Sequence, residues 1–449
     1  MSNPISDFLD RVDYLDQVDI AMLAPSRAGK STLVCAMIDE FKRRLRQRGI
    51  EASLEPLGGE DDIYDYSNKI LGKTVHAPVS TKVHIDNISR DYTKALKTPA
   101  RKFTAAAKGT RDCAMLSFRL GDGNTAMPFR ILDYPGGAIS SNPFVVPGTD
   151  SSGLEDHARV LDVFSSNCFA LVVPLFAMAL MELFALDGKL AKGEISQEEF
   201  DIRHDRLEAV LCRSDIVSRV STWVLDRAKQ KKNGVLILAP VKCETFLNDT
   251  DEAVRFQKAG LLERVVKQFV FEQIIDEIRN ADPGPDILKN IADYVTVEYL
   301  PVQTFGNVFS KALFEWPADL ADHADAPSVT FSDIYYKKTG SIPHPSGAAG
   351  ILQTILRARN GLLEEAKRKK GEALEAELDA QNWFFGFFRE LFGLNDLLKF
   401  KIKVSFEEAA QMNALVAKIA GLGLGTKDLS RWDWDFSENG VEETDWSED

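Results

Sequence analysis

The sequence predicts an α/β fold with a mostly parallel central sheet and flanking helices. Three observations support this prediction: short apolar runs recur along the chain, helical patterns separate them, and a Gly-Lys-Ser turn joins the first run to the first helix. Strands that alternate with helices form parallel sheets, and such strands are apolar because both faces of the sheet are covered. The 449 residues, 45% of them hydrophobic, suffice for a large core.

The first elements lie around that turn. The run "VDIAML" (18–23) predicts a strand, and the apolar period after it predicts a helix over 31–48 that ends in basic residues. Residues 50–110 are less regular and are interpreted as an insertion. The runs 113–120 and 126–133, on either side of "GDGN", predict a β-hairpin.

Strands and helices continue to alternate after the hairpin. The predicted strands are 168–173, 234–241 and 294–302, and the predicted helices lie near 154–166, from 176 to about 230 and over 256–280. The stretch 176–233 is long and charged, so it is interpreted as a helical insertion.

The predicted organisation has four parts. Residues 1–17 form an N-terminal extension, 18–345 the α/β domain with its two insertions, 346–430 a C-terminal helical region, and 431–449 an acidic tail. The tail has three of the six tryptophans among its acids and cannot form a core of its own, so it is expected to be mobile. The aromatic segment 382–394 is open to three interpretations: core, oligomer contact or membrane contact.

Composition excludes some classes of protein. The net charge of -14 argues against a dedicated nucleic-acid binder, which would carry a basic surplus. The five cysteines show no CxxC spacing, and the first residues carry acids where a secretory signal has a basic and then an apolar stretch. A cytoplasmic protein is the resulting expectation.

One apolar segment is long enough to span a bilayer. Cys168 to Leu186 carries a single charge, that of Glu182. Pro174, however, divides the segment into a strand-like half and a helix-like half. A buried strand followed by a core helix is therefore the preferred interpretation.

The stretch "IAMLAPSRAGKSTLV" (20–34) carries the strongest motif. Gly29, Lys30 and Ser31 stand where a strand meets a helix, as in the P-loop pattern GxxxxGK[ST], although Ala24 replaces the first glycine. Backbone N–H groups of such a turn hold phosphates, the lysine adds charge at the outer phosphates, and the serine hydroxyl binds Mg²⁺. The residues expected to contact a nucleotide here are Ser26, Ala28, Gly29, Lys30, Ser31 and Thr32.

The hairpin supplies candidates for the metal and the terminal phosphate. In "ILDYPGG" the strand ends in Asp133, which is expected to hold Mg²⁺ directly or through water, and Gly136 is expected to donate its N–H to the terminal phosphate. Thr110, 23 residues before Asp133, is the candidate for a second metal contact in a segment that orders with triphosphate. The rivals for that role are Thr81, Thr93 and Thr104.

A third motif, "VKCE", follows a buried strand where GTP-binding proteins have the [NT]KxD guanine motif. Lys242 can lay its stem along a purine, and Glu244 can accept both guanine N–H donors. Glutamate is longer than aspartate, and Val241 lacks the hydrogen-bonding group of Asn or Thr, so an ordinary strand-end pair is the alternative. The later loop "PVQTFG" is expected to place Gln303 and Thr304 near the base.

The order AxxxxGKS, Thr, DYPG, VKCE resembles the translation-factor-related (TRAFAC-like) class of P-loop GTPases. The phrases "SRAGKS" and "LDYPGG" are similar to those of the bacterial stress-associated YcjX-like GTPases. The resemblance is limited to short motifs within about residues 18–306. It implies a P-loop NTPase fold that binds GTP or GDP with Mg²⁺.

Arg27 lies inside the turn, two residues before Gly29. Guanylate-binding proteins and atlastins look similar here, and in those families this arginine acts as an intrinsic finger on the phosphates when two G domains meet. The resemblance implies a catalytic role for Arg27 in a homodimer formed through the nucleotide face. Gly137 stands where many GTPases have a water-orienting glutamine, which favours this role. The alternative is that Arg27 points outward and pairs with an acid of 60–62.

The sequence therefore predicts a Mg²⁺-dependent GTPase switch with Lys30, Arg27 and Thr110 as catalytic residues and Ser31, Thr110 and Asp133 at the metal. One alternative is an ATP-binding ATPase or kinase in which "VKCE" contacts no guanine. Another is a nucleotide-held scaffold with negligible hydrolysis that recruits a protein through its C-terminal helices.

Overall fold

The computed structural model describes a large part of the chain. The described residues are 18–25, 28–50, 53–56, 69–72, 80–97, 102–104, 114–121, 126–134, 139, 151–248, 251–306, 308–315, 330–337, 344–362, 414, 418–419 and 430–436.

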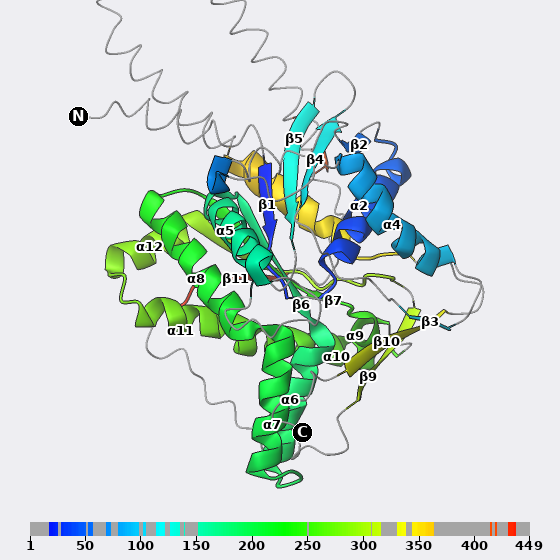
Figure 1. Ribbon diagram of the computed structural model, residues 1–449, viewed down its shortest axis with the longest axis vertical. Coiled ribbons are helices and arrows are strands. Elements are labelled where there is room, and N and C mark those ends of the chain that lie inside the picture. Colours follow the sequence, from blue (N-terminus) through cyan, green and yellow to red (C-terminus); the bar gives the residue numbers. More distant parts are fainter. Residues whose placement is uncertain are drawn as a thin grey trace, which may run out of the picture.

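A mixed sheet of eight strands forms the centre of the fold, in the order β11-β8-β7-β6-β1-β5-β4-β2 (Figure 1). Five neighbouring strands, β8, β7, β6, β1 and β5, run parallel, whereas β4 pairs antiparallel with β5, β2 with β4, and β11 with β8. The strands of this sheet are β1 (Val18–Met22), β2 (Ser53–Pro56), β4 (Ala114–Gly121), β5 (Ala126–Asp133), β6 (Ala170–Phe176), β7 (Gly234–Val241), β8 (Val295–Tyr299) and β11 (Ser430–Trp432). A second, antiparallel sheet has the order β3-β10-β9, with β3 (Lys102–Thr104), β9 (Val308–Glu315) and β10 (Thr330–Lys337).

Helices cover both faces of the large sheet. One face carries α2 (Lys30–Gln47), α4 (Thr81–Lys97) and the helical residues 348–362. The other face carries α5 (Ser151–Asn167), α6 (Ala177–Ala191), α7 (Gln197–Leu211), α8 (Arg213–Gln230), α9 (Glu244–Leu247), α10 (Glu252–Val266), the π-helix η3 (Lys267–Phe271), α11 (Glu272–Asn280) and α12 (Pro285–Tyr294). Figure 1 shows α6 and α7 projecting from the sheet side by side.

Strand β1 contributes to both cores because successive side chains point to opposite faces. Val18, Ile20 and Met22 pack beneath α2, whereas Ala21 and Leu23 pack on the face of α5 and α6. The predicted α/β class with a mostly parallel sheet and flanking helices is confirmed.

Most predicted elements around the motifs are confirmed within a few residues. The strand at 18–23, the hairpin and the strand at 234–241 are present, and the long apolar segment forms β6 and α6. Within the described residues, no helix combines the length and the apolar run that a membrane crossing needs.

The boundary between strand and helix, expected at Pro174, lies after Phe176, where β6 ends. Val172 O accepts from the N–H of Leu23, so Val172 faces β1, and Pro174, two residues later, faces the same side. The pairing of β1 with β6 ends at Val172, so the missing N–H of Pro174 removes no bond of that ladder.

The single helix predicted over 256–280 contains a π-helical turn, η3. This turn buries Phe269, Val270 and Phe271 in succession, which a regular α-helix with one buried face does not do. Phe271 then becomes a contact for the C-terminal tail.

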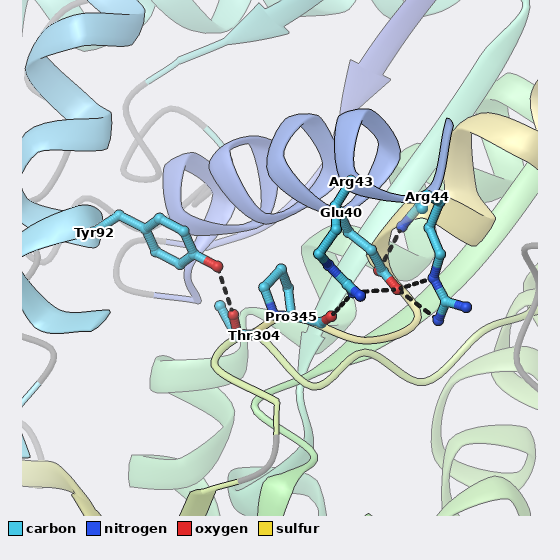
Figure 2. A network of polar contacts seen from close by, with 7 residues as sticks. Glu40, Arg43, Arg44, Tyr92, Thr304 and Pro345 are labelled. Atoms are coloured by element: carbon cyan, nitrogen blue, oxygen red, sulfur yellow. Dashed lines mark hydrogen bonds and ion pairs between the residues drawn. The ribbon is translucent and has the colours of Figure 1, made fainter. Parts of the chain in front are cut away.

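Residues 348–362, assigned from the sequence to a separate C-terminal region, pack in the same core as α2. Glu40, which is fully buried on α2, accepts from Ala349 N–H at 2.9 Å and from Arg44 at 3.1 Å. Arg43 donates to Pro345 O at 3.1 Å (Figure 2). A buried carboxylate thus satisfies an N–H at the start of the second helix and fixes it to α2.

The structure places residues 431–436 of the predicted tail, which was expected to be mobile; residues 437–449 lie outside the described residues, so for them mobility stays a prediction. Ser430–Trp432 forms the edge strand β11 on β8, and Trp432 stacks on Tyr299 with ring centres 5.3 Å apart. Trp432 and Trp434 both contact Phe271, and Trp434 donates to Val295 O at 2.8 Å. The aromatic residues that alternate with the acids supply apolar surface, so this segment packs on the sheet although its composition is acidic.

Replacing Trp432 with alanine is expected to lower the free energy of unfolding by about 3 kcal/mol, because a buried aromatic contact is lost at the sheet edge. Urea unfolding followed by circular dichroism measures this change. Phe256→Ala is the matched control, because the Phe256 side chain is 55% exposed on α10. Equal unfolding midpoints for the two variants would contradict the assignment of β11.

Candidate functional site

The candidate site lies at the carboxyl ends of β1, β5 and β7. The chain passes from β5, on one side of β1, to β6, on the other, so β1 is the point where the strand order changes direction. Open α/β sheets bind ligands in the crevice outside the strand ends at such a point. The motif residues near Lys30, Asp133 and Lys242 all follow strands that end at this edge.

Gly29 forms the junction between the turn and helix α2. Its φ of 101° lies in the left-handed region, which a glycine adopts without strain. Helix α2 begins at Lys30, with no acid in its first turn and no side chain capping it. The helix therefore presents backbone N–H groups and the positive end of its dipole to the site, which favours an anion.

Lys30 is 6% exposed and lies over the turn. Its Nζ donates to Ala24 O at 2.8 Å and to Pro25 O at 3.4 Å, and it lies 4.7 Å from the centre of the Tyr134 ring. The ammonium group is thus held above the backbone that encloses the helix start, where it adds positive charge to that of the helix dipole.

Tyr134 connects the turn to the hairpin. Its ring is fully buried, and its hydroxyl accepts from Ala24 N–H at 3.0 Å. The residue after Asp133 therefore fixes the first residue of the "AxxxxGKS" motif, although 110 positions separate them.

Asp133 and Ser31 meet between β5 and α2. Asp133 is fully buried, and its Oδ2 accepts from Ser31 Oγ at 3.0 Å. Its Oδ1 is buried and has no hydrogen-bond partner among the described residues. Burial raises the pKa of the Cys35 thiol on α2 to about 12, and the charge of Asp133 adds to this rise.

These two side chains fit a hard divalent cation. Mg²⁺ prefers oxygen ligands and is commonly held by one or two protein groups together with phosphates and water. A buried carboxylate oxygen with no partner is costly unless a cation or a donor satisfies it. Ser31 Oγ and Asp133 Oδ1 are the atoms that can hold such a cation.

Lys242 reaches the turn from the end of β7. Its backbone has a positive φ of 61°, its Nζ lies 4.5 Å from the centre of the Phe176 ring, and its Cε lies 3.6 Å from where a Cβ on Gly29 would stand. The lysine stem therefore lies alongside Gly29 and extends the site from the turn toward β7.

Glu244 is fully buried at the start of α9. Its Oε1 accepts from Phe305 N–H at 2.6 Å, so this carboxylate is bonded to the loop after β8. If Glu244 accepts guanine N–H groups with both oxygens, as expected, Oε1 must either accept a second hydrogen bond or release Phe305 N–H.

The loop with Gln303 and Thr304 is held in place by its neighbours. Thr304 Oγ1 accepts from Lys242 N–H at 3.3 Å, and Thr304 O accepts from Tyr92 Oη–H at 3.0 Å (Figure 2). Gln303 donates through Nε2 to Asn248 at 2.6 Å. Thr304 thus adjoins Lys242 as expected, while the amide of Gln303 is directed to Asn248.

The structure brings together Ala28, Gly29, Lys30, Ser31, Asp133, Lys242, Glu244 and Thr304 at this edge. Thr32 is half-buried in the first turn of α2. Four predicted site residues, Ser26, Arg27, Thr110 and Gly136, lie outside the described residues, so their roles stay predictions.

Three residues that had no role in the predicted site lie at it in the structure: His84, Tyr92 and Tyr134. His84 Nε2 lies 3.5 Å from Asp133 Oδ2. On α4, His84, Ile88 and Tyr92 recur every four residues and therefore share one helix face, which is a signal that the sequence contained. The spacing predicts that the three side chains share a face, but it does not predict which residues that face contacts.

No protein-family model matches this sequence, and no curated protein matches it significantly.

Tyr134→Phe is expected to lower the free energy of unfolding by about 1–3 kcal/mol, because the buried Ala24 N–H loses its acceptor. Amide hydrogen exchange should also become faster in a peptide that contains residues 23–25. Tyr294→Phe, on α12, is the control. Unchanged exchange at Ala24 in Tyr134→Phe would contradict the proposed anchoring of the turn.

Proposed function

We propose that this protein is a Mg²⁺-dependent GTP-binding and GTP-hydrolysing switch protein of the P-loop class. The observation that carries the proposal is the meeting of Lys30, Ser31 and Asp133 at the N-terminus of α2, with a buried Asp133 oxygen that no described residue hydrogen-bonds. This set combines a cation, a helix dipole and metal-binding oxygens, which together suit a polyphosphate.

The phosphates would bind to the N–H groups of the turn and of the first turn of α2. Lys30 would exchange its contacts with Ala24 and Pro25 for the outer phosphates, as a mobile ammonium group can. Ser31 and Asp133 would hold Mg²⁺, which when bound neutralises phosphate charge.

Hydrolysis requires water in line with the terminal phosphate and donors that stabilise developing charge. The chain's contribution is positioning and electrostatic stabilisation, because there is little covalent chemistry for a protein to do in phosphoryl transfer. Arg27, Thr110 and Gly136 are proposed for this step on the sequence motifs alone. Activation through Arg27 in a homodimer is part of the same proposal.

The residues proposed to contact the nucleotide base, Lys242 and Glu244, are weaker evidence for guanine than Lys30, Ser31 and Asp133 are for a triphosphate. Lys242 lies beside Gly29, as a residue that stacks on the base requires. Glu244, however, already accepts from Phe305 N–H. This bond favours a second candidate function, an NTPase that binds ATP as well as GTP.

Lys30→Ala is expected to weaken GTP binding by roughly 10–100-fold, since hydrogen bonds to charged groups contribute about 1.5–3 kcal/mol. Equilibrium titration with fluorescently labelled GTP in the presence of Mg²⁺ measures the effect. Lys42→Ala, three turns further along α2, is the matched control. Wild-type affinity in Lys30→Ala would refute the phosphate site.

Competition of unlabelled GTP and ATP against the labelled nucleotide separates the two candidates. GTP is expected to compete at least about 10-fold better than ATP, and Glu244→Gln is expected to remove this preference because the amide group cannot accept two guanine N–H bonds. The amide oxygen that this substitution introduces can still accept from Phe305 N–H, and Glu252→Gln on α10 is the control. Equal competition by both nucleotides in the wild type would favour the base-indifferent enzyme.

A further inference from the structure

Helix α4 belongs to the insertion that the motifs leave unassigned, yet it reaches the proposed metal site. His84, in its first turn, is half-buried, and its Nε2 lies 3.5 Å from Asp133 Oδ2. The insertion therefore brings an imidazole to the carboxylate of the "LDYPGG" motif.

The start of α4 is fixed to the hairpin that carries Asp133. Thr81 is buried, its Oγ1 accepts from Ser117 N–H at 3.0 Å, and it donates to Met115 O at 3.4 Å. Met115 pairs with Leu132, the neighbour of Asp133 in β5. One turn after this anchor, the helix brings His84 to the end of β5.

The later part of α4 is fixed to the loop that contains Thr304, at the side of the site where the nucleotide base is proposed to bind. Tyr92 donates to Thr304 O at 3.0 Å (Figure 2). The Tyr92 ring also stacks on the Phe305 ring, with ring centres 5.5 Å apart. With anchors on both sides of it, His84 has little freedom to move away from Asp133. A helix held in this way can keep a side chain at a defined place in a metal site.

The two oxygens of the Asp133 carboxylate have different neighbours. Oδ2 accepts from Ser31 and faces His84, whereas Oδ1 is buried and has no partner in the part of the chain that the structure describes. Within the described residues, His84 Nε2 is buried and makes no hydrogen bond, although it lies 3.5 Å from Oδ2. If the Ser31 hydroxyl turns to a metal, its bond to Oδ2 is lost, and the imidazole is then in place to donate to Oδ2 and to keep the carboxylate from rotating. Groups that hold a ligating carboxylate in this way matter nearly as much as the ligands themselves.

We propose that His84 is a positioning residue of the metal site: its Nε2–H donates to Asp133 Oδ2 and holds Oδ1 toward Mg²⁺. This inference rests on the proposed function, because it assumes that Mg²⁺ binds with the nucleotide at Ser31 and Asp133. It assigns the inserted helix α4 to the nucleotide site.

The test compares His84→Phe, which fills the space without a donor, with His84→Gln, which retains an N–H donor near the position of Nε2. Binding of labelled GTP is measured at equilibrium from EDTA to millimolar Mg²⁺. His84→Phe is expected to raise the Mg²⁺ concentration at half-saturation by about 10-fold or more, within the range of roughly 10–100-fold that lost outer partners cause. His84→Gln is expected to lie close to the wild type, and GTP affinity in EDTA is expected to be the same in all variants.

His204→Phe, on α7, controls for the loss of an imidazole elsewhere. If His84→Phe does not fold, His84→Asn replaces it, because the shorter amide withdraws the donor from Asp133. A wild-type Mg²⁺ midpoint in the donor-free variant overturns the inference. So does a loss of GTP affinity that is equally large in EDTA, because that result indicates a structural role alone.

The two proposals can fail separately. A wild-type protein that binds GTP without Mg²⁺ dependence, or not at all, refutes the proposed function and the role of His84 together. Mg²⁺-dependent binding that is unaffected by His84→Phe leaves the proposed function standing and refutes the role of His84.

Discussion

The candidate site is organised around a carboxylate with no exposed surface. Asp133 ends β5, and a buried charged group is tolerated only where neighbours supply donors or a cation. Ser31 on α2 and His84 on α4 both approach it, so helices from different parts of the chain meet at one strand end. The next residue, Tyr134, faces the turn and holds Ala24. Strand, turn and both helices are thereby joined into one structural unit, and the placement of Lys30 follows from it.

Helix α2 is constrained at its start and in its middle. Its first turn contacts the end of β5 through Ser31, and its third turn carries Glu40, which accepts from Ala349 N–H. The second contact joins the helix to residues 344–349, and Ser346 pairs in turn with Gln303 in the loop beside Lys242. Parts of the chain about 300 residues apart in sequence therefore share one hydrogen-bonded frame, as expected when buried polar groups must all be satisfied.

Sequence patterns predicted what lies within a strand or directly after it. The apolar runs located β1 and β7, and the motifs that follow these strands identified Lys30 and Lys242, which the structure places at the same edge of the parallel sheet. His84 could not be found in this way, since its contact with Asp133 joins an insertion to the sheet through space. Composition also misled: the acids of the tail favoured mobility, although Trp432, Trp434 and Phe436 alternate with them as in a strand.

The position of β11 in the chain has a consequence for synthesis on the ribosome. Strand β8 is made first, and its outer edge stays unpaired until the tail emerges roughly 140 residues later, which takes about 7 to 30 seconds at typical rates of translation. An unpaired strand edge is a template for wrong pairing with other chains. A nascent chain that stalls in this interval would display that edge to chaperones and to its neighbours on the same polysome.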